Sequence, residues 1–288
     1  MMKMRSNILN IKNNFIFFIF LFIVGCSNTS KNCETIKPEY FILKGMNLKT
    51  IGEYSKALDL YKKALKNGDK TANLYEEIGE TYTKLGDYSK GIKYYKKALK
   101  ETSYTTDINR NISYIYYLKG DYKKSLEYLE KLYDNELDLE TKKLKGFLFI
   151  KTKKYEEALA YLKNLEKEIT VFDRTYYENY INFLLKKGNS QDLSQALNEI
   201  SNKYYNNIEA MIFYFSVKEK TNKNLESLEK ELKRYIVTHK ESDDLYILLA
   251  EIEYKLKNYK EKDLILKFVS SKGKAKEKYI KLLGEDYE

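Results

Sequence analysis

The feature of this sequence that most restricts its fold is an internal repeat of 34 residues. The segment 51–66, IGEYSKALDLYKKALK, and the segment 85–100, LGDYSKGIKYYKKALK, are identical at ten of sixteen positions. The tyrosine of this motif recurs as Tyr54, Tyr88, Tyr122, Tyr155 and Tyr259. The last interval of 104 residues corresponds to three further units of about 35. Such a period is typical of repeat architectures, in which each unit buries its apolar face against its neighbours.

Small residues recur with the same period, inside segments whose other residues favour helix. One series is Gly45, Gly79, Ser113 and Gly146, and a second is Ala57, Gly91, Ser125 and Ala158. Because glycine inside a helix costs about 1 kcal/mol relative to alanine, its recurrence indicates a packing role. Small residues on facing helices let the two helices approach closely. Each unit is therefore predicted to be two antiparallel helices joined by a short turn such as LGD or KGD.

Composition agrees with a helical chain that has a solvated surface. The chain is 43% hydrophobic, which is enough for a core, and its 12 glycines and one proline leave little material for a β-sandwich. The net charge of +10 becomes 10 − 3 = +7 without Lys3, Arg5 and Lys12, which lie in a leader described below. The remaining cations are interspersed with acids, a pattern that favours a solvated helix surface over a nucleic-acid-binding face.

A fixed order of residue types recurs in the units. In the second unit it is Tyr75, Ile78, Gly79, Tyr82, Gly91, Tyr95 and Ala98, and in the first it is Phe41, Gly45, Leu48, Ala57, Tyr61 and Ala64. This order resembles the tetratricopeptide repeat, with an aromatic, Leu-Gly and Tyr in the first helix and Ala, aromatic and Ala in the second. The resemblance implies an all-α solenoid of stacked helix pairs. The proline that often ends repeats of this family is absent, with Asp69 and Ser103 in its place.

The resemblance predicts a solenoid of about seven units over residues 38–276. The units are expected at 38–71, 72–105, 106–138, 139–172 and 243–276, with degenerate fifth and sixth units at 173–207 and 208–242. An open solenoid needs capping ends. Residues 277–288 are therefore predicted to form a C-terminal capping helix and tail.

The first 25 residues are predicted to be a lipoprotein signal peptide that is removed. Residues 1–14 carry three cations and no acid, and ten apolar residues follow at 15–24. Ten residues of helix span about 15 Å, roughly half of the hydrocarbon core, so this run indicates a secretory signal and not a membrane span. The sequence Ile23-Val24-Gly25-Cys26 resembles the lipobox of bacterial lipoproteins, which implies cleavage before Cys26 and lipidation of that cysteine.

Residues 26–37 are predicted to be the lipidated N-terminus and a flexible tether with a reach of about 20 Å. Two or three acyl chains anchor a protein stably, so the chain is expected to be exported and lipid-anchored to the bacterial cell membrane. In many two-membrane bacteria an Asp after the lipidated Cys retains a lipoprotein in the inner membrane. Ser27 stands there and favours the outer membrane, while the periplasmic or surface side stays open. Cys33 is the remaining thiol, free or cross-linked.

No group of residues in the sequence predicts catalysis or a cofactor. His239 is the only histidine, which excludes a metal site built from several imidazoles and an intrachain His relay. The glycines of LGDYSKG belong to a turn and a helix interface, and no phosphate-binding loop is present. Paired acids such as Glu76 and Glu77 lie at helix starts, where the positive end of the helix dipole stabilises carboxylates. We expect no enzyme activity, metal, cofactor, nucleic-acid partner or small-molecule substrate.

The resemblance also implies that the first helices of successive units line a concave surface. Side chains at i, i+4 and i+7 should face it. These are Ile42, Met46, Lys49, Glu76, Glu80, Thr83, Arg110, Tyr114, Tyr117, Lys143, Phe147, Ile150, Glu178, Asn182 and Leu185. The predicted partner-binding groove is the middle of this surface, Arg110, Tyr114, Tyr117, Lys143 and Phe147, because aromatics beside cations are favoured in interface hot spots. The alternative is that these rings pack within the stack.

Members of this family that bind the C-terminal carboxylate of chaperones use a clamp in which an Asn recurs on the first helices. At the corresponding positions this chain has Met46, Glu80, Tyr114 and Phe147, so the clamp is absent. The sequence therefore predicts a membrane-anchored scaffold that recruits or assembles envelope proteins, or peptide segments of them, through the groove. One alternative is a cell-wall-polymer-binding protein or a regulator of cell-wall enzymes, with tyrosines stacked on sugars and Glu76, Glu80 and Glu178 as its acids. Another is a surface-exposed lipoprotein with an external partner. The partner and the oligomeric state stay open.

Overall fold

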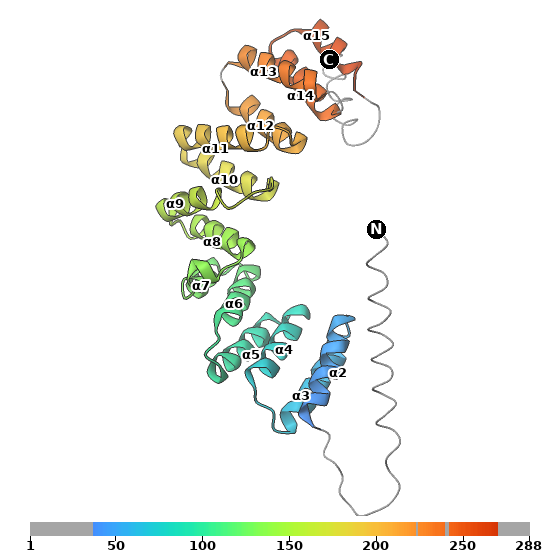
Figure 1. The fold of residues 1–288 in the computed structure, drawn as a ribbon, viewed down its shortest axis with the longest axis vertical. Coiled ribbons are helices and arrows are strands. Elements are labelled where there is room, and N and C mark those ends of the chain that lie inside the picture. Colours follow the sequence, from blue (N-terminus) through green and yellow to red (C-terminus); the bar gives the residue numbers. More distant parts are fainter. Residues whose placement is uncertain (1–36, 223, 240–241, 270–288) are drawn as a thin grey trace, which may run out of the picture.

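The computed structural model describes residues 37–222, 224–239 and 242–269, which form fourteen α-helices and one short 3-10 helix (Figure 1). The first helices of the pairs are α2 (Pro38–Thr50), α4 (Ala72–Lys84), α6 (Thr106–Leu118), α8 (Leu139–Lys151), α10 (Arg174–Lys187), α12 (Ile208–Thr221) and α14 (Asp243–Lys255). The second helices are α3 (Tyr54–Lys66), α5 (Tyr88–Glu101), α7 (Tyr122–Leu129), α9 (Tyr155–Leu165), α11 (Ser190–Lys203), α13 (Leu225–Thr238) and α15 (Tyr259–Leu266). The 3-10 helix η1 (Asp134–Glu136) follows α7.

The predicted fold class is confirmed. The described residues form an all-helical solenoid of seven stacked pairs, and the fifth and sixth pairs, expected to be degenerate, consist of complete helices of 14 residues each. In that part of the chain no helix is long and apolar enough to cross a membrane. The predicted signal peptide at 1–25, the lipidation site Cys26, nearly all of the tether and the capping segment at 277–288 lie outside the described residues.

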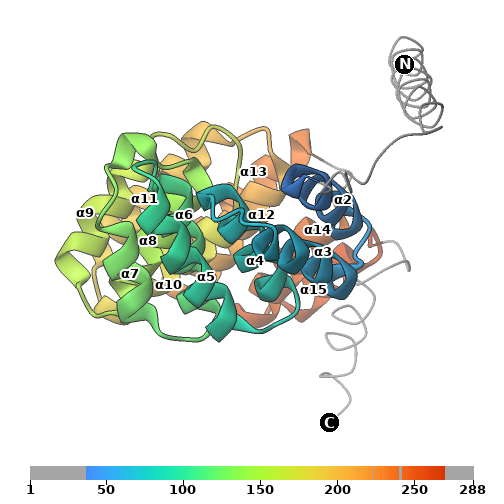
Figure 2. The same ribbon diagram turned by 90° about the horizontal axis from the view of Figure 1, so that it is seen from below.

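The pairs stack into a curved solenoid. Figure 1 shows α4, α6, α8, α10 and α12 along the inner side of the curve and α5, α7, α9, α11 and α13 along the outer side. Seen from below in Figure 2, successive pairs are rotated about the axis of the stack. The first helix of each of these pairs therefore faces the concave side, as the family resemblance implies.

The recurring glycines allow the two helices of a pair to touch. A Cβ atom at Gly45 would lie 2.5 Å from the ring of Tyr61, and one at Gly146 would lie 2.5 Å from the side chain of Leu162. The Tyr61 ring is fully buried, and its hydroxyl donates a hydrogen bond of 2.7 Å to Glu77. Because this ring is held in place, the first pair can keep its close packing only with glycine at position 45.

In the third pair, two serines occupy the corresponding close contact between the helices. Ser113 on α6 and Ser125 on α7 are both fully buried. The Ser113 hydroxyl lies 2.8 Å from the Ser125 carbonyl, and the Ser125 hydroxyl lies 2.9 Å from the Ser113 carbonyl. Small size permits the close approach, and these bonds satisfy hydroxyls that would be costly to bury alone.

The turn inside six of the seven pairs contains a described residue with positive φ. Glycine provides it in four pairs, at Gly52, Gly86, Gly120 and Gly188. Lysine takes this conformation in the fourth and seventh pairs, with φ of 64° at Lys153 and 62° at Lys257. In the second pair the next residue, Asp87, caps α5 by accepting a 3.1 Å hydrogen bond from the Lys90 backbone N–H. The motif LGD therefore encodes a left-handed turn followed by a helix N-cap.

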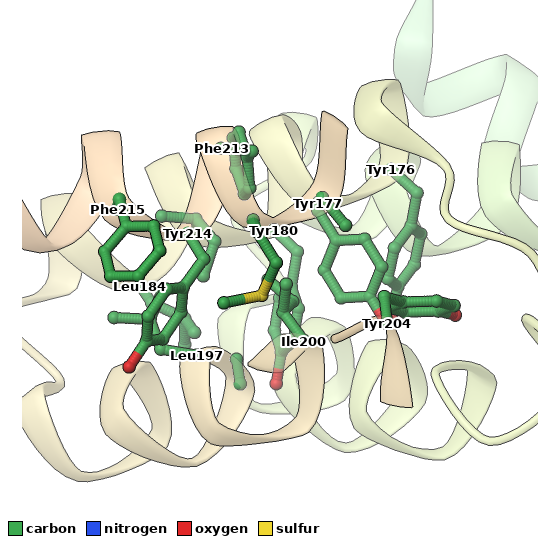
Figure 3. Packing of buried hydrophobic residues seen from close by; sticks show 14 of the residues in the cluster. Tyr176, Tyr177, Tyr180, Leu184, Leu197, Ile200, Tyr204, Phe213, Tyr214 and Phe215 are labelled. Atoms are coloured by element: carbon green, nitrogen blue, oxygen red, sulfur yellow. The ribbon is translucent and has the colours of Figure 1, made fainter. Parts of the chain in front are cut away.

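Aromatic rings fill the core of the fifth and sixth pairs (Figure 3). The ring of Tyr177 lies across those of Tyr176 and Tyr204, with centroids 5.1 and 6.0 Å away. The buried hydroxyl of Tyr176 donates to the Leu162 carbonyl at 2.6 Å, and that of Tyr204 donates to the Ile169 carbonyl at 2.7 Å. Both acceptors belong to the end of α9 and the linker that follows it. These hydrogen bonds join the linker to the next pair of helices.

Candidate functional site

The inner side of the solenoid contains a groove of about 580 Å³ between α6, α8 and the start of α10. All five residues predicted for the partner-binding groove line it: Arg110, Tyr114, Tyr117, Lys143 and Phe147. Arg110, Tyr114 and Tyr117 come from α6, and the other two come from α8. Residues at i, i+4 and i+7 share one face of a helix, which is why a spacing read from the sequence brings them to one surface.

The aromatic side of the groove is open to solvent. The side chains of Tyr114 and Tyr117 are 50% and 38% exposed, and their stacked rings have centroids 6.4 Å apart. Tyr122, after the turn, continues this row with its ring centroid 5.9 Å from that of Tyr117. Phe147 is half-buried and lies 6.1 Å from the buried ring of Tyr176. Tyr114 and Tyr117 are thus available at the surface, whereas Phe147 also packs in the stack.

The two cations of the groove are held by carboxylates. The guanidinium of Arg110 lies 2.8 Å from Asp138 and also contacts Asp107. The Lys143 ammonium, with a side chain only 10% exposed, lies 2.6 Å from Glu140 and also contacts Asp173. Arg110 and Lys143 therefore cross-link successive units and are not free cations at the edge of the groove.

The contacts in these ion pairs shift the pKa values of Lys143, Asp138 and Asp173. Burial alone would lower the pKa of Lys143, but its hydrogen bonds with Asp173 and Glu140 hold that pKa above its ordinary value. The hydrogen bond from the Thr141 backbone N–H, helped by the charge of Arg110, lowers the pKa of Asp138. Burial alone would raise the pKa of Asp173, but the hydrogen bond with the Lys143 ammonium, together with those from backbone N–H groups, outweighs burial and lowers this pKa. All these groups are charged at neutral pH.

The acids of the groove were not among the predicted residues. Asp138 and Asp173 each precede an inner helix and cap it, accepting hydrogen bonds from the backbone N–H groups of Thr141 and Tyr176 at 2.8 and 2.9 Å. Both lie outside the helical positions i, i+4 and i+7. The available signal was an Asp directly before each of these helices, which indicates an N-cap but not an ion pair with the preceding unit.

The rest of the predicted concave surface is divided. Glu178, Asn182 and Leu185 line a smaller groove of about 230 Å³ between α10 and α12, which extends the inner surface. Ile42 is instead buried in the core of the first pair. Lys49 lies 2.8 Å from Glu77 and also contacts Glu80. The open surface is therefore concentrated in the third to sixth pairs.

The acids considered for chemistry on a polymer do not form a pair. Glu80 contacts Lys49 on the neighbouring α2, and Glu178 accepts a 2.8 Å hydrogen bond from Arg174. Burial, with the charge of Asp107, raises the pKa of Glu76. Among the residues that the structure describes, no group of three or more His, Cys, Asp or Glu could hold a metal ion.

Two segments of the chain, 72–103 and 108–137, match the family model of the tetratricopeptide repeat. They coincide with the second and third helix pairs. These two segments are therefore tetratricopeptide repeats, and the described part of the chain has the fold of a solenoid of this type. Proteins of this repeat class mediate binding to proteins or peptides. No curated protein matches the chain in sequence.

Solved structures resemble the fold at low sequence identity. A tetratricopeptide repeat protein from Parabacteroides merdae is 19% identical, with a TM-score of 0.51 over 86% of this chain and 97% of its own. MamA from Desulfovibrio magneticus is 15% identical, with a TM-score of 0.51 over 60% and 98%. YrrB, described as a TPR protein with an unusual peptide-binding site, is 20% identical, with a TM-score of 0.49 over 59% and 88%. The two matches with a TM-score of 0.51 show a likeness of fold alone.

Proposed function

We propose that this protein is an interaction scaffold that binds a peptide segment of a partner protein in the groove between α6, α8 and α10. The observation that carries the proposal is the exposed, stacked pair Tyr114 and Tyr117 in a concave groove of about 580 Å³. Exposed tyrosines provide large contact area at a low cost in side-chain entropy and are enriched at interfaces. The repeat class, which binds proteins or peptides, supports the same function.

We further propose that the scaffold is exported, anchored through a lipid on Cys26 and engaged in recruiting envelope proteins at the outer membrane. The sequence Ile23-Val24-Gly25-Cys26 behind a cationic start and a ten-residue apolar run supports the anchor. In cells fed radioactive palmitate, the wild-type protein is expected to be labelled and to fractionate with membranes. Cys26→Ser should abolish the labelling. Equal labelling of the two proteins would contradict the anchor.

The groove can be tested by site-specific photo-crosslinking in intact cells. A photoreactive phenylalanine analogue at position 114 or 117 is expected to give covalent adducts with a partner protein, identified by mass spectrometry. Tyr114→Ala combined with Tyr117→Ala should reduce capture of that partner at least tenfold, equal to about 1.4 kcal/mol. The helical circular dichroism should stay unchanged, because both side chains are exposed.

Two other tyrosines provide a matched control. Tyr104 and Tyr133 are strongly exposed, come from the same region of the chain and lie outside the groove lining. The photoreactive analogue at these positions should not give the same adduct, and Tyr104→Ala with Tyr133→Ala should leave capture intact. Adducts of equal yield from all four positions would place the partner elsewhere, and loss of helicity in the Tyr114 and Tyr117 variant would show a structural role.

A further inference from the structure

The groove offers no free cation to an acidic ligand, apart from Lys151 at its edge. Arg110 contacts Asp107 and Asp138, and Lys143 contacts Glu140 and Asp173. A ligand carboxylate would have to displace one of these carboxylates and leave it unpaired near the groove. Removing one member of a partly buried ion pair is costly, so an acidic peptide gains little from either cation.

The acids, in contrast, reach the solvent. Glu140 is 81% exposed on its side chain, and Asp107 and Asp138 are also exposed, while Lys143 is nearly buried. The groove lining contains the cations Arg110, Lys143 and Lys151 and the acids Asp138, Glu140 and Asp173. With Asp107, which contacts Arg110, the local charge is 3 − 4 = −1, although the whole chain carries +10. The surface that a ligand meets is therefore acidic and aromatic.

The faces of the exposed rings are also unoccupied by cations. Lysine ammonium groups lie over many tyrosines of this chain, such as Lys187 over Tyr155 at 3.4 Å and Lys131 over Tyr128 at 3.8 Å. Across the described ranges, none lies over Tyr114 or Tyr117. An aromatic face beside carboxylates attracts an ammonium or guanidinium group through both its quadrupole and their charge.

From this charge complementarity we propose that the groove selects a peptide segment that carries Lys or Arg next to an apolar side chain. The ligand cation lies against Tyr114 and Tyr117 and pairs with the exposed carboxylates of Asp138 and Glu140. The apolar side chain packs on Leu144 and Phe147, which line the same groove. The inference rests on the proposed function, because it specifies the ligand of that same groove.

Selection from a phage-displayed library of random 12-residue peptides tests the proposal. The bait is the full-length protein in detergent, and binders are counter-selected on the Tyr114→Ala, Tyr117→Ala variant. The selected peptides are expected to contain at least twice as many Lys and Arg as Asp and Glu, together with an aliphatic or aromatic residue. For one selected peptide, Glu140→Lys should weaken binding about fivefold, equal to roughly 1 kcal/mol.

Glu157→Lys is the matched control, since Glu157 is exposed on α9 outside the groove and its substitution makes the same change in net charge. It should leave the affinity unchanged. Selected peptides that are neutral or acidic but still depend on the two tyrosines would overturn this inference and keep the proposed function. An equal loss of affinity in both lysine variants would also overturn it. No enrichment over the double variant would contradict both the inference and the function.

Discussion

Replacement of Asp173 by alanine is expected to lower the free energy of unfolding by about 3 kcal/mol. The Asp173 carboxylate caps α10 by accepting a 2.9 Å hydrogen bond from the Tyr176 backbone N–H, and loss of such a cap costs about 1 kcal/mol. The same carboxylate contacts the nearly buried ammonium of Lys143. Without it, Lys143 keeps only the exposed Glu140, and this loss adds about 2 kcal/mol.

Urea unfolding followed by circular dichroism measures the effect, and two variants separate its parts. Asp173→Asn keeps a cap acceptor and removes the charge, so its stability should lie between those of the wild type and Asp173→Ala. Asp87→Ala removes a cap whose lysine partner, Lys90, is exposed, and should cost much less than Asp173→Ala. Equal losses for Asp87→Ala and Asp173→Ala would show that the contact with Lys143 contributes nothing.

The same contact has a defined pH dependence. The Lys143 ammonium lowers the pKa of Asp173 below its unfolded value of about 4. The resulting stabilisation is fully present above the unfolded pKa and is lost as the pH falls through the lower folded pKa. In Asp173→Ala this contribution should be missing. The difference in stability between wild type and variant should therefore shrink below pH 4, where the native carboxylate becomes protonated.

The groove shows how far the sequence alone could lead. The 34-residue period predicts the helix pairs, and helical spacing then places Tyr114, Tyr117 and Phe147 on one surface. The pairing of Arg110 with Asp138 joins two successive units and depends on how the second unit is rotated on the first. The spacing of residues within one unit does not predict how that unit is rotated relative to the next. The sequence therefore predicted a cationic edge where the structure has neutralised cations and exposed acids.

The fifth pair illustrates a different limit. Its first helix, α10, lacks the glycine or serine that marks the earlier first helices, and it buries Tyr176, Tyr177 and Tyr180 instead. These large rings fill the interface that small residues close elsewhere (Figure 3), and the Tyr176 hydroxyl donates a hydrogen bond to the Leu162 carbonyl. The repeat signal is lost because the packing changes, while the helix pair is kept. The small-residue period therefore does not mark the first helix of this unit.

These rings also surround a buried carboxyl group. Glu166, at the end of α9, is only 7% exposed, and its Oε1 atom has no hydrogen-bond partner. The buried hydroxyl of Tyr177 and the charge of Lys203 favour the ionised form of this carboxyl group, but burial outweighs both. Lys203 donates to the Glu166 backbone carbonyl at 3.1 Å and not to its carboxylate. Burial, followed by the negative charge of Glu199, raises the pKa of Glu166 to about 7.

Glu166→Gln is therefore expected to raise the free energy of unfolding by about 2 kcal/mol at pH 8 and to change it little at pH 5. A carboxyl whose folded pKa lies above its unfolded pKa stabilises the fold fully below the unfolded pKa, near 4.5, and this stabilisation is lost as the pH rises through about 7. The neutral amide has no such loss. Urea unfolding of both proteins at the two pH values measures the difference, and Glu157→Gln, an exposed position on the same helix, should show none. Wild type and Glu166→Gln curves that stay parallel from pH 5 to pH 8 would mean that the carboxylate is solvated in the folded protein, and that the junction between the fourth and fifth pairs does not respond to pH.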